Sequence, residues 1–152
     1  MRNIVKVLIA AVVLTLTSCV SKEGTETAPQ YLDVNASNIA GGWTLQTLNG
    51  EALAKDIYLY IDLVRKDMTF KMYTNIDGFT NVAQVETGRF VLYVDELLGA
   101  AVIRGDYDHG AGEWAHRYTI TELTKDSMTW TALDDPDFVQ IFSRVDEIPV
   151  KK

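Results

Sequence analysis

The chain has few of the residues that form disulfides or that most often act as metal ligands and general bases: among 152 residues there are one cysteine and two histidines. A single cysteine, Cys19, excludes an internal disulfide. The apolar run Val7–Leu16 has ten residues, whereas a helix needs about 20 to cross a membrane. No glycine loop of the phosphate-binding kind precedes a helix. The chain must therefore be stabilised by a hydrophobic core of its own.

Basic residues are also scarce: 14 lysines and arginines stand against 21 aspartates and glutamates, a formal charge of −7. Without the first 18 residues, which include Arg2 and Lys6, the charge is −9. An acidic surface repels phosphate backbones, and no basic stripe with interleaved aromatics is present. We therefore expect no nucleic-acid partner and no charge-driven attachment to anionic lipid.

The start of the chain has the features of a targeting signal. Two basic residues precede the apolar run and two small residues follow it, which is the pattern of a cleaved secretory signal. The order Leu16-Thr17-Ser18-Cys19 resembles the lipobox of bacterial lipoproteins. That resemblance implies removal of residues 1–18 and acyl chains on Cys19, which anchor the protein in a membrane. The alternatives are a signal that ends near a cysteine by chance and a true membrane helix.

Residues 19–38 are mostly polar or small and show no sustained period. Such a segment buries too little apolar surface to order itself, so it predicts a lipidated, flexible tether before a folded domain at 39–148. Val20, in place of Asp, resembles the sorting context of outer-membrane lipoproteins. We expect a cell-envelope protein anchored by lipid in the outer membrane, on either its periplasmic or its external face.

From Gly42 onward, short strand-like runs alternate with turn formers, and no segment shows a helical stripe. Only Glu51–Asp56 has room for a single helical turn. Eight runs at this spacing favour an all-β fold, an up-and-down antiparallel barrel of about eight strands, because closure removes exposed edges. The expected strands are Trp43–Leu48, Ile57–Leu63, Met68–Thr74, Gln84–Val94, Leu97–Tyr107, Ala115–Leu123, Met128–Leu133 and Phe138–Val145.

Alternation along these runs predicts an apolar inward face and a polar outer wall. An eight-stranded barrel is either filled by its side chains or just able to hold one small ligand. In the second case Tyr118 and Gln140 are candidates to orient the ligand by hydrogen bonds. The candidate ligand-binding residues are Leu59, Ile61, Phe70, Met72, Phe90, Leu92, Tyr118, Trp130, Gln140 and Phe142.

One part of the sheet breaks the alternation. Val91 and Tyr93 lie on the face opposite Phe90, and Leu97–Ile103 is apolar on both faces. A sheet that is apolar on both sides needs a second cover. The candidate covers for the wall Gln84–Ile103 are the Tyr31-Leu32 end of the tether, a homodimer partner or another protein, unless the assigned alternation is one residue out of register.

The motif Gly41-Gly42-Trp43 opens the first expected strand. It resembles the G-x-W signature of lipocalins and related calycin barrels, in which the Trp closes one end of the barrel. An Arg from the last strand lies over that Trp in those families, and Arg144 matches it by its place in the chain. The resemblance implies a structural clasp between Trp43 and Arg144.

A longer set of motifs follows in order: Leu48-Asn49-Gly50, Ile57-Tyr58-Leu59-Tyr60-Ile61, Asp67-Met68-Thr69-Phe70, Glu86-Thr87-Gly88-Arg89-Phe90, Gly105-Asp106-Tyr107-Asp108, Tyr118-Thr119-Ile120, Leu123-Thr124-Lys125-Asp126-Ser127-Met128-Thr129-Trp130 and Arg144-Val145. Over residues 41–148 this set is similar to the lipocalin-like lipoproteins of the Bacteroides group. The resemblance implies a barrel that binds a small apolar ligand. The chain is short for a lipocalin and lacks the family's disulfides.

Both histidines lie in or beside a Gly-rich acidic loop, Asp106–Glu113. The loop lacks the oxygen ligand and the glycine that a calcium loop needs at its fifth and sixth positions. A transition-metal site requires the hairpin to bring His109, His116, Asp106 and Asp108 together, and a solvated turn is the simpler interpretation. No serine has a nucleophile-elbow context, and neither histidine has an evident orienting partner. We expect no catalytic residue, no metal and no cofactor.

These observations support a membrane-anchored lipoprotein that binds a small apolar or amphipathic ligand inside its barrel. The alternative is a filled barrel that serves as a protein-interaction or scaffold module at the outer membrane, through the Gln84–Ile103 wall. A third and weaker hypothesis is a hydrolase or metal-dependent activity centred on His109 and His116.

Overall fold

The computed structural model describes residues 28–76 and 84–149. The expected signal at 1–18, the expected lipidation site Cys19 and the first part of the expected tether lie outside these residues. Within the described part, no helix has both the length and the apolar character needed to cross a membrane.

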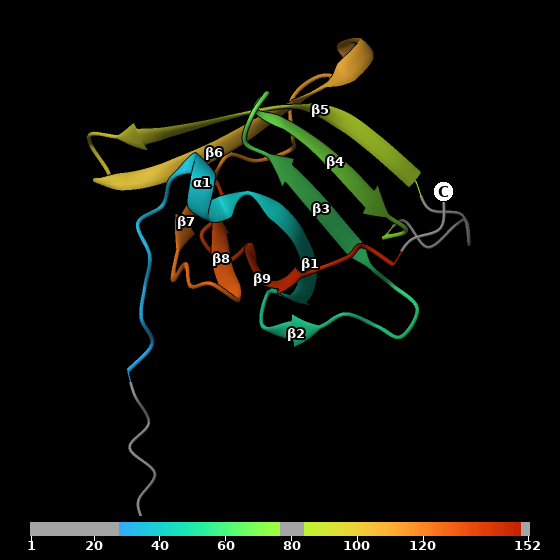
Figure 1. The fold of residues 1–152 in the computed structure, drawn as a ribbon, viewed down its shortest axis with the longest axis horizontal. Coiled ribbons are helices and arrows are strands. Elements are labelled where there is room, and N and C mark those ends of the chain that lie inside the picture. The colour runs from blue at the N-terminus through green and yellow to red at the C-terminus, as the bar shows by residue number, and fades with distance from the viewer. Residues whose placement is uncertain (1–27, 77–83, 150–152) are drawn as a thin grey trace, which may run out of the picture.

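The described chain contains one α-helix, nine strands and one 3₁₀ turn (Figure 1). They are α1 (Ala36–Ile39), β1 (Gly41–Leu48), β2 (Glu51–Ala52), β3 (Leu59–Val64), β4 (Thr69–Thr74), β5 (Gln84–Asp95), β6 (Ala100–Tyr107), η1 (Asp108–Gly110), β7 (Tyr118–Thr121), β8 (Ser127–Ala132) and β9 (Val139–Val145).

From β3 to β9 each strand pairs antiparallel with the next, which is the expected up-and-down order. β1 pairs with both β3 and β9 and thereby closes the sheet into a barrel. β2 pairs only with the end of β1, so eight strands form the ring. The expected all-β barrel of about eight strands is confirmed, and closure leaves few exposed edges.

Several local expectations differ from the structure; for example, β3 begins at Leu59 rather than Ile57. Residues 51–52 form β2 rather than a helical turn, because Asn49 and Gly50 have φ of 54° and 82° and make a tight hairpin turn. β6 begins at Ala100 rather than Leu97, because the preceding residues form the turn after β5. β7 begins at Tyr118 rather than Ala115, because the residues before it turn into the barrel.

The burial of the strands follows the predicted alternation. In β3, Leu59, Ile61 and Leu63 are buried, whereas the ring of Tyr60 packs on that of Tyr58, just before the strand, with centroids 5.7 Å apart. Of the ten inward candidates, eight are buried, and Met72 and Leu92 are partly buried against the same core. The predicted alternation therefore has the correct register.

The Gln84–Ile103 wall is not uniformly exposed. Val102 and Ile103 are fully buried, whereas Val94 and Leu97 have exposed fractions of 67% and 98%. The apolar exposure of this region is therefore greatest at the β5–β6 turn.

Residues just before β1 pack against the barrel. The Asn35 side chain accepts hydrogen bonds from the backbone of Ser37 and Asn38, both at 3.0 Å, and so caps α1. Leu32 packs on the core, and its backbone N–H donates to the carbonyl of Leu123 at 2.7 Å. The last part of the expected tether is thus in contact with the domain.

Candidate functional site

One end of the barrel is closed by α1, Trp43 and Arg144. Trp43 is fully buried, and its indole N–H donates to the Ile39 carbonyl at 2.8 Å. The Arg144 guanidinium lies 4.0 Å from the Trp43 ring centroid and donates to the carbonyls of Ala40 and Asn38, each at 2.7 Å. Burial lowers the pKa of Arg144, and the nearby Asp126 opposes that shift. The geometry is that of the expected clasp.

The barrel interior contains a cavity of about 140 Å³. Its walls come from β3, β4, the end of β6, the segment that follows it, β7 and β9, so it lies toward the end opposite the clasp. The lining residues are Leu59, Ile61, Met72, Tyr107, Trp114, Ala115, Tyr118, Gln140 and Phe142.

Six of the ten candidate ligand-binding residues line this cavity, namely Leu59, Ile61, Met72, Tyr118, Gln140 and Phe142. The other four, Phe70, Phe90, Leu92 and Trp130, belong to or pack against the core without lining it. Phe142 and Trp130 are in ring contact, with centroids 4.9 Å apart, so the cavity wall and the core are continuous.

Trp114 is the main interior residue that the sequence interpretation missed. It belongs to no strand, yet only 7% of it is exposed, and its backbone N–H donates to the Gly105 carbonyl at 2.8 Å. A Cβ on Gly105 would stand 2.1 Å from Cε2 of the indole, so the ring lies directly on this glycine. A glycine at an inward position of a strand was the one signal that a side chain from elsewhere fills the space.

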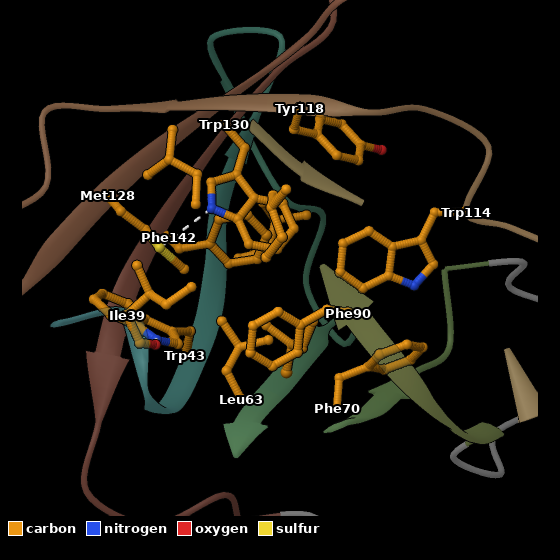
Figure 2. Close-up of a cluster of buried hydrophobic side chains, with 14 of the residues drawn as sticks. Ile39, Trp43, Leu63, Phe70, Phe90, Trp114, Tyr118, Met128, Trp130 and Phe142 are labelled. Atoms are coloured by element: carbon orange, nitrogen blue, oxygen red, sulfur yellow. Dashed lines mark hydrogen bonds between the residues drawn. The ribbon is translucent and has the colours of Figure 1, made fainter. Parts of the chain in front are cut away.

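The indole of Trp114 lies inside the barrel, between Tyr118 and Phe70 (Figure 2). Its ring stacks on Trp130 at 5.7 Å and meets Phe70 edge-on at 5.0 Å. Its nitrogen lies on the Phe70 side of the ring, buried and without a hydrogen-bond partner in the described part of the chain (Figure 2). Trp114 therefore acts as a plug that sets the size of the cavity.

The neutral polar side chains that line the cavity include Tyr118 and Gln140. Tyr118 and Gln140 are both more than nine-tenths buried, and their side chains make no hydrogen bond to any other described residue. Burial raises the pKa of Tyr118 to about 12, with smaller contributions from Tyr107 and Asp134. The Tyr118 hydroxyl is thus protonated at neutral pH and available as a donor.

At the open end, His116 has an orienting partner that the sequence interpretation did not find. Its Nδ1 lies 2.8 Å from an Asp134 carboxylate oxygen, and this bond is the main cause that lowers the pKa of Asp134. Asp134 follows β8, so the partner lies 18 residues away in sequence. The ring contacts of His116 are to Tyr118 and Phe138, at 5.9 and 4.8 Å. These contacts include no serine or cysteine nucleophile among the described residues.

His109 lies in a different depression at the same end, of about 490 Å³, formed by Val85, Glu86, Thr87, Tyr107, Asp108, His109 and Ala111. Asp108 accepts a hydrogen bond from Thr87 at 2.7 Å, and Asp106 pairs with Arg104 at 3.3 Å. The four residues considered for a transition-metal site are therefore not brought together. Among residues 28–76 and 84–149, no group of three or more His, Cys, Asp or Glu side chains is arranged to hold a metal.

The sequence matches no protein-family model and no curated protein.

Proposed function

We propose that the protein is a lipid-anchored, lipocalin-like barrel that binds one small apolar or amphipathic ligand in its interior. The observation that supports this most directly is the cavity, because six of its nine lining residues are ones that alternation alone selects. Small-molecule sites are concave and mostly apolar, with a few polar groups that orient the ligand. The cavity has this composition.

The dimensions and chemistry of the cavity limit the ligand. A cavity of about 150 Å³ in another protein admits benzene, and this one is of similar size, about 140 Å³. No charged side chain lines it, and burying an unpaired charge is costly. The proposed ligand is therefore an uncharged molecule of about one ring, with an oxygen that pairs with Tyr118 or Gln140.

Phenol and benzene test this proposal, because they have the same ring and differ by one hydroxyl. We expect the protein to bind phenol more tightly than benzene, by titration calorimetry. Gln140→Leu keeps the volume of the side chain and removes its amide, so it should lower phenol affinity up to about tenfold, the value of one net hydrogen bond, and leave benzene unaffected. Failure of the wild-type protein to bind either compound would favour a filled barrel instead.

The second part of the proposal is an acyl anchor on Cys19. It is supported by the lipobox-like sequence Leu16-Thr17-Ser18-Cys19 ahead of a folded domain whose described residues begin nine positions later. We expect the mature protein to begin at Cys19 and to carry the mass of two or three acyl chains, which gives stable attachment where one chain does not. Cys19→Ala should abolish that mass and release the protein from the membrane fraction.

A filled barrel that pairs with a second copy is the other candidate function. Trp114 is buried in the interior and stacks on Trp130, and the outward Val85 and Val91 of β5 are 49% and 39% exposed. Analytical ultracentrifugation measures whether the protein is a monomer or a dimer. A dimer that Val91→Lys converts to monomer would support the pairing of two copies, and a wild-type monomer would contradict it.

A further inference from the structure

The direction of the strands places the β5–β6 hairpin beyond the closed end of the barrel. β1 starts at this end, where Gly41 pairs with Leu63, and β4 starts there with Thr69 opposite Arg89. β5 then continues for six residues past Arg89 and pairs only with β6. Figure 1 shows the resulting hairpin projecting from the sheet on the side where α1 and the N-terminal segment lie.

The tip of this hairpin exposes apolar side chains. Leu97 is 98% exposed, Val94 67% and Leu98 54%, the highest values among the large hydrophobic residues of the described chain except for Tyr31. Natural proteins usually protect projecting apolar strands, so a group of this kind marks a contact surface.

The tip is held in one conformation by hydrogen bonds to the side chain and the backbone of Asp95. The Asp95 carboxylate accepts hydrogen bonds from the N–H groups of Leu97 and Leu98, at 3.0 and 3.1 Å, and the Asp95 carbonyl accepts one from Gly99 at 2.8 Å. Gly99 takes a φ of 61°, which a glycine adopts without strain. The two leucines are thus presented by a fixed turn, and Glu96 limits how deeply that turn can enter an apolar phase.

The N-terminal segment reaches the barrel at the same end. The backbone of Leu32 bonds to Leu123, which lies in the turn between β7 and β8. The described chain begins at Ala28, nine residues after Cys19, a separation of at most about 30 Å for an extended chain. An acyl anchor on Cys19 would therefore be joined to the domain through a segment that meets the barrel at its closed end.

We infer that the β5–β6 tip inserts Leu97 and Leu98 into the boundary between lipid headgroups and acyl chains, as a second membrane contact beside the anchor. This inference rests on the acyl anchor of the proposed function. It fixes the orientation of the domain: the clasp faces the membrane, and the end with His116 and the ligand cavity faces away from it.

Two tryptophan substitutions at opposite ends of the barrel test the inference. Leu97→Trp places the probe on the hairpin tip, and Leu133→Trp places it on an exposed residue after β8, at the open end. Each lipidated variant is reconstituted in vesicles of phosphatidylethanolamine and phosphatidylglycerol with brominated acyl chains, which quench tryptophan only at close range. The wild-type protein supplies the baseline, because Trp43, Trp114 and Trp130 are all buried.

We expect Leu97→Trp to lose emission in brominated vesicles and to shift to the blue in ordinary ones, and Leu133→Trp to show neither change. Flotation of the vesicles with wild type and Cys19→Ala reports on the anchor separately. A protein that floats without quenching at position 97 overturns the insertion and leaves the anchor in place. Equal quenching at both positions overturns the orientation, and a wild type that does not float overturns anchor and insertion together.

Discussion

At the scale of single residues, Arg144 makes a set of contacts that another side chain cannot reproduce. Its guanidinium lies on Trp43 and donates to the carbonyls of Ala40 and Asn38 at once. A lysine keeps the charge but has neither the planar face nor the fixed fork of donors. Arg144→Lys should therefore lower the free energy of unfolding by about 2 kcal/mol, the range of one charged hydrogen bond and one cation–π contact. Urea denaturation of the wild type and of Arg144→Lys measures the difference in the free energy of unfolding.

Arg117→Lys is the matched control, because Arg117 is half exposed and its ion pair with Glu113 is 3.7 Å long. Exposed pairs of this kind contribute about 0–1 kcal/mol, so the control should unfold close to the wild type. Equal stability of Arg144→Lys and wild type would show that the contacts of the clasp do not stabilise the closed end.

Gly105 is a residue whose identity follows from a single contact. A Cβ at this position would lie 2.1 Å from Trp114, so Gly105→Ala must displace the indole or the strand. We expect a loss of about 1–3 kcal/mol, as for other overpacked cores, and a red-shifted tryptophan emission if the indole moves outward. In a Trp114→Ala background the same substitution should cost much less, since the clash is absent.

At the scale of elements, the His116–Asp134 bond joins the segment before β7 to the turn after β8. Hydrogen bonding to His116 lowers the pKa of Asp134 in the folded state. The stabilisation is therefore present above the ordinary carboxyl pKa of 3.8 and is lost as pH falls through the lowered folded value. Asp134→Asn should unfold at lower temperature than wild type at pH 7, and the two melting temperatures should converge in acid. If the difference between the two melting temperatures persists unchanged in acid, the hydrogen bond between His116 and Asp134 is not its cause.

The elements also show how far the sequence could predict this fold. Strands such as β3 were predictable because Leu59, Ile61 and Leu63 alternate with polar or aromatic neighbours. α1 was not, because its four residues are too few to show a helical period. The β5–β6 hairpin was identified as apolar on both faces, but only the pairing of Thr69 with Arg89 shows that it extends beyond the barrel.

The candidate site was predictable to the extent that it lies on strands. Alternation selected Leu59, Ile61 and Phe142, which line the cavity. It did not select Trp114, because a residue that follows a Gly-rich turn has no strand period to reveal its direction. The partner of His116 was also hidden, because Asp134 is 18 residues away and approaches only when β7 and β8 pair.

At the scale of the whole molecule, the capacity of the barrel depends on whether Trp114 is a fixed plug. Trp114→Ala removes a side chain that packs against Phe70 and Trp130, and loss of a buried Trp costs about 3–5 kcal/mol. The vacated space has the shape of an indole ring. Added indole should therefore raise the melting temperature of Trp114→Ala in a concentration-dependent way, because a ligand of the folded state stabilises by mass action.

The wild-type protein is the control for indole rescue, and its response separates two mechanisms. With a fixed plug the cavity of about 140 Å³ admits one ring, so indole should not change the wild-type melting temperature while phenol raises it. If indole also stabilises the wild type, Trp114 moves aside for larger ligands. In that case the segment between η1 and β7 acts as a gate, and the barrel binds molecules larger than its resting cavity.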